Sequence, residues 1–182
     1  MLKDIINQNN SIIVVWDVQN GLVNRIFNKE EFLKALERTL NLARRKKIPV
    51  VFTKITPYPQ GFEPFNSRVF PRQFKFTKED LELYFKPLED EIVINKNTWS
   101  IFVGTNFELL LRNSGRNIIL FTGISTEIGV ETSARHAFAL GFLPVIISDS
   151  VSSPNREAHE RSLANMKELF PTISSEELEK IL

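Results

Sequence analysis

Residues 118–142 constrain the fold of this chain most strongly, because they read as a buried strand, a tight turn and an amphipathic helix in direct succession. Residues 118–121 form an uninterrupted apolar run, which is typical of a parallel strand covered by helices on both faces. Gly123 breaks this run. From about Thr126 the spacing becomes helical, with Val130, Ala134, Ala137 and Phe138 on the predicted inner face.

The turn between this strand and this helix is the first place to expect chemistry. A strand that runs directly into a helix presents the first backbone N–H groups of the helix at the carboxyl edge of the sheet, where they favour an anion. Ser125 and Thr126 add hydroxyl groups at the same corner. These hydroxyls either cap the helix, which is the commoner role, or contact a ligand.

The rest of the chain alternates strands with helices. Strands are predicted at residues 11–17, 48–53, 91–94, 118–121 and 143–148, and helices at 30–47, 77–84, 105–113, from about 126, 155–170 and 174–182. This order predicts an α/β fold in a single domain over residues 1–182, with a mostly parallel sheet and helices on both faces.

Composition excludes several function classes. The 23 Lys and Arg residues nearly balance the 22 Asp and Glu residues, so charge gives no indication of a nucleic-acid or membrane partner. The chain has no cysteine, which excludes disulfides, thiolate metal sites and a cysteine nucleophile. Met1 leads into a polar segment without an apolar signal region, and no apolar run approaches the roughly 18 residues of a membrane span, so we expect a cytoplasmic location.

Two charged residues stand at predicted strand ends. Asp17 ends the first strand and Lys96 follows the third, and ligands in open parallel sheets lie beyond the carboxyl ends of strands. Asp17 either acts in catalysis or caps the turn that follows it. Residues 54–76 are irregular and rich in proline and phenylalanine, as in a lid or a subunit interface. Arg68 and Arg72 in this segment can meet a ligand carboxylate.

Four stretches in this order resemble the isochorismatase-like hydrolases, or cysteine hydrolase superfamily, which includes nicotinamidases and N-carbamoylsarcosine amidohydrolases. They are VVWDVQNGLV around Asp17, VINKNTWSIFVGT around Lys96, TGISTEIGVETSARHAF, and SDSVSS with EAHERSLANM. The resemblance covers nearly the whole chain. It implies a Rossmann-like three-layer α/β/α sandwich whose mostly parallel sheet has about five or six strands.

The resemblance also implies a catalytic set of aspartate, lysine and cysteine. The aspartate is Asp17 and the lysine is Lys96, but the cysteine falls on Gly129. True isochorismatases are similar in having glycine there: their aspartate protonates a vinyl ether and water adds to the resulting oxocarbenium carbon. This chain departs from them in carrying Ser125 in place of a tyrosine and Ile55 in place of a glutamine that contacts the substrate. Near Ser125 the family places oxyanion contacts and a non-proline cis peptide.

The expected site therefore has Asp17, Lys96 and Gly129 in catalytic positions, and the expected ligand is a small molecule that carries a carboxylate. The residues expected to bind this substrate are Ser125, Thr126, Ile128, Phe62 and Trp99. No cofactor and no metal are expected, because residues 53–63 lack the aspartate and histidines that metal-binding family amidases use. His136 is expected to be packed or paired, and His159 to be structural.

Two functions remain open at this point. One is a hydrolase without a cysteine nucleophile, in which Asp17 is the general acid and Lys96 gives electrostatic support. The other is a non-catalytic small-molecule-binding or structural homologue. The presence of both Asp17 and Lys96 favours the hydrolase. We further expect Lys96 to lower the pKa of Asp17 until a substrate carboxylate offsets its charge, and we expect the five phenylalanines between Phe62 and Phe76 to mark a homo-oligomer.

Overall fold

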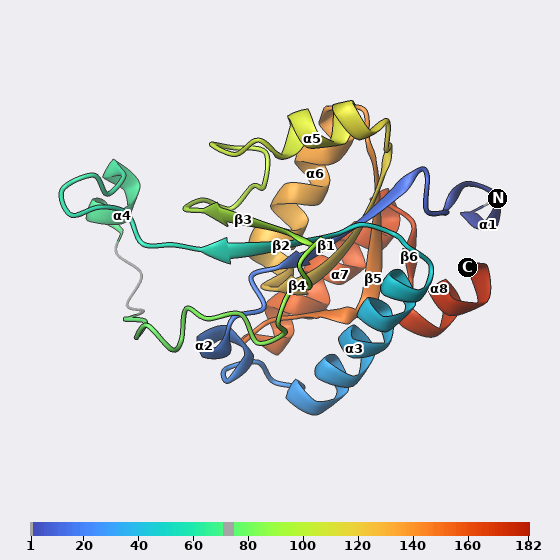
Figure 1. Cartoon of the computed structure of the whole chain (residues 1–182). Coiled ribbons are helices and arrows are strands. Elements are labelled where there is room, and N and C mark those ends of the chain that lie inside the picture. The colour runs from blue at the N-terminus through green and yellow to red at the C-terminus, as the bar shows by residue number, and fades with distance from the viewer. Residues whose placement is uncertain (1, 71–74) are drawn as a thin grey trace.

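The computed structural model describes residues 2–70 and 75–182, and its centre is a six-stranded parallel sheet (Figure 1). The strands are β1 (Ser11–Trp16), β2 (Val50–Ile55), β3 (Ile92–Lys96), β4 (Ile118–Ile124), β5 (Leu143–Ser152) and β6 (Thr172–Ile173). Their order across the sheet is β3-β2-β1-β4-β5-β6, and all neighbouring pairs are parallel. The chain thus winds outward from β1 in one direction and from β4 in the other. The crevice between β1 and β4 is where doubly wound sheets bind ligands.

Helices cover both faces of the sheet, as predicted. They are α1 (Leu2–Ile5), α2 (Asn20–Val23), α3 (Lys29–Arg45), α4 (Phe65–Val69), α5 (Phe107–Ser114), the π-helical turn η1 (Thr126–Val130), α6 (Glu131–Ala139), α7 (Arg156–Leu169) and α8 (Ser175–Ile181). Buried side chains of α3 and α8 share one core with one face of the sheet, and those of α5, α6 and α7 share a second core with the other face. The result is the expected three-layer sandwich (Figure 1).

The apolar runs form strands because both faces of the sheet are covered. In β1, Ile13 and Val15 belong to the core under α3, whereas Ile12, Val14 and Trp16 belong to the core under α5 and α6. All six residues of β1 are buried. A strand in this position has no solvent face, so its sequence shows no alternation of polar and apolar residues.

Close packing of β4 against β1 requires a glycine at residue 123. Gly123 has φ 114°, and a β-carbon there would lie 2.1 Å from the backbone oxygen of Trp16. No side chain fits in that space, and few L-residues adopt that backbone conformation. Gly123 therefore lets the end of β4 lie directly beside the end of β1.

Three local expectations were wrong. Residues 77–84 form turns rather than a helix, because their backbone groups bond to residues 18–21: Tyr84 N donates to Val18 O (2.9 Å) and Asn20 N donates to Glu82 O (2.9 Å). Phe138 was expected on the inner face of its helix but is 61% exposed. The final pair of strands was also underestimated, since β5 continues to Ser152 and the two-residue β6 follows α7.

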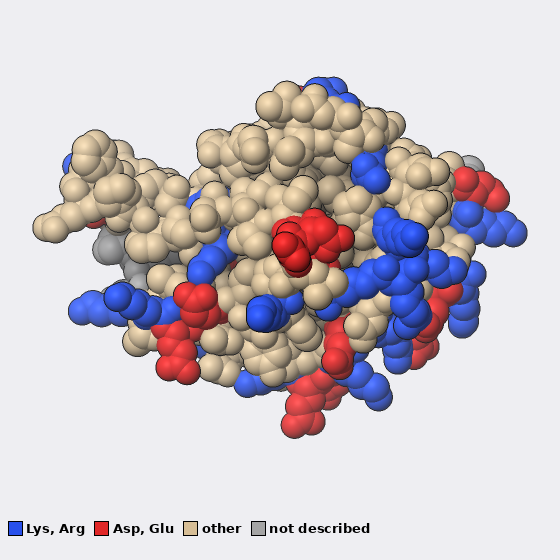
Figure 2. Space-filling view, viewed as in Figure 1, with Lys and Arg blue, Asp and Glu red and all other residues tan. Residues whose placement is uncertain are grey.

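Residues 56–70 project from the end of β2 and, together with residues 75–76, are called the arm here (Figure 1). The arm carries α4 in a segment that was expected to be irregular throughout. Phe62, Phe65 and Phe70 are 77%, 74% and 81% exposed. Figure 2 shows the arm at the left, with a largely uncharged tip on this face. Two residues expected to matter here, Arg72 and Phe74, lie outside the described residues.

The buried side chain of Gln19 connects the chain segments before and after the arm. The Nε2 atom of Gln19 donates to the carbonyl oxygens of Ile55 (3.2 Å) and Leu81 (2.7 Å), and its Oε1 atom accepts a hydrogen bond from Ile55 N (2.9 Å). Gln19 is 1% exposed. The chain that leaves the sheet after β2 and the chain that returns before β3 are therefore held beside the end of β1.

Candidate active site

Three adjacent strands bring Asp17, Thr53 and Lys96 together at the carboxyl edge of the sheet. Asp17 follows β1, Thr53 lies in β2 and Lys96 ends β3, so the lysine side chain reaches across β2 to the aspartate. Lys96 Nζ lies 2.6 Å from Asp17 Oδ2, and the Thr53 hydroxyl donates to Asp17 Oδ1 at 2.6 Å. Asp17 is 4% exposed and Lys96 is 2% exposed. The predicted charged pair therefore exists as a direct, buried contact.

The backbone of Asp17 has the left-handed conformation that few residues other than glycine adopt. Its φ is 46°, its N–H donates to Thr53 Oγ1 (2.9 Å), and its carbonyl accepts from Gln19 N (2.8 Å). Strained backbone of this kind persists where its surroundings hold it, and it is concentrated at functional sites. Both carboxylate oxygens are bonded to Lys96 or Thr53, so the Asp17 side chain points toward β2 and β3 rather than capping the turn that follows it.

Burial dominates the protonation of this pair. It raises the pKa of Asp17 above its usual range, although the charge of Lys96 and the hydrogen bonds from Lys96 and Thr53 act in the opposite direction. Burial also lowers the pKa of Lys96, against the attraction of Asp17. The expectation that Lys96 sets the net direction for Asp17 was wrong, because it left out the loss of water around the carboxyl group. The proton affinities of the two groups therefore approach each other.

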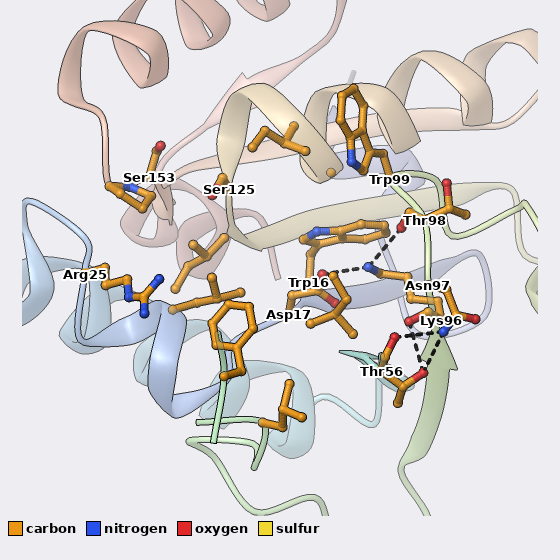
Figure 3. A pocket seen from close by; sticks show the side chains of 18 of the residues that line it. Trp16, Asp17, Arg25, Thr56, Lys96, Asn97, Thr98, Trp99, Ser125 and Ser153 are labelled. Atoms are coloured by element: carbon orange, nitrogen blue, oxygen red, sulfur yellow. Dashed lines mark hydrogen bonds and ion pairs between the residues drawn. The ribbon is translucent and has the colours of Figure 1, made fainter. Parts of the chain in front are cut away.

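A cavity of about 550 Å³ opens beside the pair (Figure 3). This size suits a small organic molecule. Much of the wall is apolar, with contributions from Leu22, Ile55, Phe76, Leu81, Ile124 and Ile128. Arg25 also lines the cavity, and its guanidinium group lies 5.3 Å from the ring centroid of Phe76. The cavity thus has the Asp17–Lys96 pair on one side and apolar side chains along much of the rest of its wall.

The structure places most of the predicted site residues in this wall. Asp17, Lys96, Gly129, Ser125, Ile128 and Trp99 all line the cavity. Thr126 is fully buried behind the wall, and its hydroxyl is hydrogen bonded to His159 Nδ1 at 2.8 Å. Phe62 lies on the exposed part of the arm, whereas Ser67 and Phe76 of the same arm reach the cavity.

The turn after β4 has the cis peptide that the family resemblance implied, between Ile124 and Ser125. In the π-helical turn η1, the N–H groups of Ile128, Gly129 and Val130 all donate to the carbonyl oxygen of Ser125, at 3.2, 3.1 and 3.3 Å. Ser125 makes no side-chain capping bond within the described chain. These three N–H groups are consequently used inside the turn, and the expected anion site does not draw on them.

Trp16 is one of the site residues that sequence reasoning did not identify, together with Thr53 and Arg25. Lys96 Nζ lies 3.8 Å from the centroid of a Trp16 ring, a cation–π contact. A β-carbon on Gly129 would lie 1.9 Å from the indole Nε1 atom of Trp16. The indole thus fills the space that a side chain at residue 129 would need. A tryptophan directly before Asp17, at the end of an aliphatic strand, was the available signal.

Both histidines are packed away from the charged pair. His136 Nδ1 is hydrogen bonded to Ser100 Oγ (2.8 Å), and its ring lies 5.1 Å from that of Phe102. His159 bonds Thr126 and packs edge-on against Phe27 at 5.3 Å. Burial lowers the pKa of His159 and so favours its neutral form. Both histidines are thus packed against an aromatic ring and hydrogen bonded to a hydroxyl group.

Within residues 2–70 and 75–182, no group of three His, Cys, Asp or Glu side chains is arranged to hold a metal ion. In the same part of the chain, no helix has both the length and the apolar character needed to cross a lipid bilayer.

The fold and the site together define a doubly wound α/β protein with a buried acid–base pair beside a small-molecule cavity at the switch point of the sheet. Residues 11–177 match the family model described as the isochorismatase domain, and the chain belongs to this family.

Individual relatives agree with this assignment. An isochorismatase family protein from Burkholderia thailandensis has a similar structure, with a TM-score of 0.83, 27% sequence identity and coverage of 96% of both chains. Nicotinamidase 3 from Arabidopsis thaliana is 27% identical over 88% of this chain and 82% of its own length. The isochorismatase family protein YwoC from Bacillus subtilis is 39% identical over 85 residues. That match spans 47% of this chain and 43% of YwoC, less than half of either.

Proposed function

We propose that this protein hydrolyses a small, unsaturated anionic molecule, a vinyl ether such as isochorismate or a related compound, without a side-chain nucleophile. The observation that carries the proposal is the buried 2.6 Å contact between Lys96 and Asp17, which faces a cavity where Trp16 and Gly129 leave no room for a nucleophilic side chain at residue 129. Family membership supports hydrolysis of a small molecule. Vinyl ether cleavage fits because water, rather than the protein, attacks the substrate.

In the proposed reaction Asp17 first acts as a general acid. Its carboxyl proton passes to the terminal carbon of the enol ether, the π electrons form the new C–H bond, and the ether oxygen stabilises the positive charge on the adjacent carbon. Water then adds to this oxocarbenium carbon and returns a proton to the Asp17 carboxylate. The resulting hemiketal collapses to a ketone and an alcohol, which from an enol-pyruvyl ether are pyruvate and the alcohol.

The surroundings of Asp17 support both halves of this cycle. Burial raises the pKa of Asp17, so the carboxyl group retains a proton at a higher pH than an exposed aspartate does. Once the proton has been donated, Lys96 and Thr53 hold the carboxylate through hydrogen bonds of 2.6 Å each. The apolar wall of the cavity excludes water from the rest of the substrate.

The test compares pyruvate release from isochorismate and other enol-pyruvyl ethers with ammonia release from nicotinamide. The wild-type protein is expected to release pyruvate more slowly in D2O than in H2O, because proton transfer to carbon is slow, and to release no ammonia. Asp17→Asn should abolish turnover but retain ligand binding. Asp149→Asn is the matched control, since the Asp149 carboxylate accepts hydrogen bonds from Ser175 N (2.8 Å) and Oγ (2.7 Å) rather than lining the cavity. Turnover by Asp17→Asn at the wild-type rate would exclude the general-acid role.

The second candidate function is a non-catalytic small-molecule-binding protein. The observation that favours it is the same Trp16 indole, which occupies the space beside Gly129 while the cavity remains. This function predicts that ligands bind equally well to the wild type and to Asp17→Asn, and that no enol-pyruvyl ether or amide is consumed by either.

A further inference from the structure

The indole N–H of Trp16 is a hydrogen-bond donor that has no acceptor among residues 2–70 and 75–182, so water or a bound molecule must supply one. Trp16 is 2% exposed, and buried tryptophan N–H groups nearly always find an acceptor. Within the described part of the chain, Nε1 of Trp16 makes no hydrogen bond, and Trp16 lines the cavity. The donor is therefore left for whatever molecule occupies the cavity.

Two contacts fix the direction in which this N–H points. Lys96 Nζ lies 3.8 Å from the centroid of the Trp16 ring, and the space for a β-carbon on Gly129 coincides with the nitrogen edge of the indole. Figure 3 shows that the nitrogen lies on the edge of Trp16 toward Ser125 and Arg25, whereas Lys96 lies toward the opposite end of the ring. The donor thus lies on the side of the cavity lined by Ser125 and Arg25, at the end of the indole away from Lys96.

We propose that Trp16 is a substrate-binding residue whose indole N–H donates a hydrogen bond to an oxygen of a ring-shaped, unsaturated ligand. The apolar wall accommodates the ring, and the N–H takes a carbonyl or carboxylate oxygen. A carboxylate is the stronger partner, because hydrogen bonds to charged acceptors are stronger than neutral ones. Gly129 serves this role by leaving room for the indole. The inference rests on the proposed function for the kind of ligand, a small anion, and is independent of the reaction.

The experiment follows the indole N–H directly. The chain has two tryptophans, so ¹H–¹⁵N NMR shows two indole resonances, and Trp99→Phe identifies the Trp16 resonance by removing the other. The probes are benzoate, benzamide and fluorobenzene, added to about 10 mM so that even millimolar affinities are detected. Benzoate should move the Trp16 resonance downfield and slow its exchange with water, and benzamide should do so less. Fluorobenzene, a ring without an oxygen acceptor, should neither move the resonance downfield nor slow its exchange with water.

Affinity measurements with Trp16→Phe give a second readout. Phenylalanine retains an aromatic ring near Lys96 but has no N–H, so benzoate binding should weaken about tenfold, the scale of one hydrogen bond to a charged group. Fluorobenzene binding should change little. Phe138→Leu, which changes an exposed aromatic ring on α6 outside the cavity wall, is the control and should bind benzoate as the wild type does.

The inference is overturned if benzoate and benzamide leave the Trp16 resonance of the wild-type protein unmoved, or if Trp16→Phe binds benzoate as tightly as the wild type. The first readout needs no substitution at residue 16 and so does not depend on the stability of that variant. Neither readout requires turnover. A shifted Trp16 resonance without pyruvate release would exclude the proposed reaction and leave the binding role of Trp16 intact.

Discussion

The indole nitrogen of Trp16 lies 1.9 Å from the position that a β-carbon on Gly129 would occupy, so the two residues cannot both carry large side chains. Because of this contact, the glycine at the position of the family's cysteine is more than the loss of a thiol group. A missing thiol alone would leave an empty space beside the helix. Here the space is filled by an aromatic ring that also contacts Lys96 at 3.8 Å from its centroid.

Gly129→Cys should therefore fail to create an amidase. The new side chain collides with Trp16, and forcing extra atoms into a packed core typically costs about 1–3 kcal/mol. We expect a lower urea midpoint and no ammonia release from nicotinamide. Trp16→Val with Gly129→Cys should be more stable than the sum of the two single effects predicts, because valine vacates the space that the cysteine needs. A single Gly129→Cys variant with wild-type stability would show that Trp16 moves aside easily.

Lys96→Met should make stability more dependent on pH. A folded-state pKa above the unfolded value means that the folded protein binds the extra proton, so this contribution to stability is lost as pH rises from the ordinary aspartate pKa through the folded pKa of Asp17. The charge of Lys96 is the largest effect that opposes the raised pKa of Asp17, so this pKa should rise further in Lys96→Met. Lys96 itself has a lowered pKa, which makes stability increase with pH, and the substitution removes that contribution too. Urea unfolding of Lys96→Met should show stability falling more steeply as the pH rises above the ordinary pKa of an aspartate.

The matched control for that prediction is Asp17→Asn with Lys96→Met. Leaving one partner of a buried ion pair alone typically costs about 3–5 kcal/mol, whereas replacing both by neutral groups costs much less. The double variant should thus be more stable at neutral pH than Lys96→Met and should show a flatter pH profile. Equal pH profiles for the two variants would mean that Asp17 does not titrate in this window.

Thr53→Val should impair catalysis by releasing Asp17. The Thr53 hydroxyl donates to Asp17 Oδ1 (2.6 Å) and accepts from Asp17 N (2.9 Å), so it holds both the carboxyl group and the left-handed backbone. We expect kcat to fall about a hundredfold with KM nearly unchanged, as when a reacting group is displaced. Because the Thr53 hydrogen bond lowers the pKa of Asp17, its loss should also move the pH profile of kcat upward. Thr53→Ser keeps the hydroxyl and should keep most of the activity.

The arm predicts self-association. Phe62, Phe65 and Phe70 are each at least 74% exposed, and apolar surface of this kind usually marks an interface. Light scattering at micromolar concentration should report a dimer or a larger assembly. Replacing the three phenylalanines by serine should lower the measured mass of the assembly without lowering the unfolding temperature. Phe138→Ser, which changes one exposed residue on α6, should leave the mass of the assembly unchanged. A monomeric wild-type protein would contradict this prediction.

Sequence reasoning succeeded where local pattern decides structure. The apolar runs identified five of the strands, and the position of Asp17 and Lys96 at strand ends placed both in one site before any contact was known. It was wrong about residues 77–84, because their backbone partners lie some sixty residues earlier in the chain, as in the bond from Tyr84 N to Val18 O. Helical spacing does not reveal such a partner.

Two features of the site depend on packing that no local pattern contains. Trp16 reads as one more core residue of β1, and only the fold shows that it abuts Gly129. The direction of the Asp17 pKa shift depends on how completely water is removed from the pair, since desolvation and the charge of Lys96 have opposite signs. The positions of Asp17 and Lys96 at strand ends predict that the lysine charge lowers the pKa of Asp17, but they do not predict how completely the pair is buried.

The hydrogen bonds of Gln19 make the geometry at the carboxyl edge of the sheet independent of the length and sequence of the arm. Because one amide group bonds Ile55 and Leu81, the points where the chain leaves and rejoins the body stay fixed whatever lies between them. The free energy of closing a loop grows only slowly with its length. Insertions, deletions and recombined segments can therefore be accepted between these two points while Asp17 and Lys96 keep their contact. In protein engineering, the segment between Ile55 and Leu81 can therefore be exchanged to change which molecules enter the cavity.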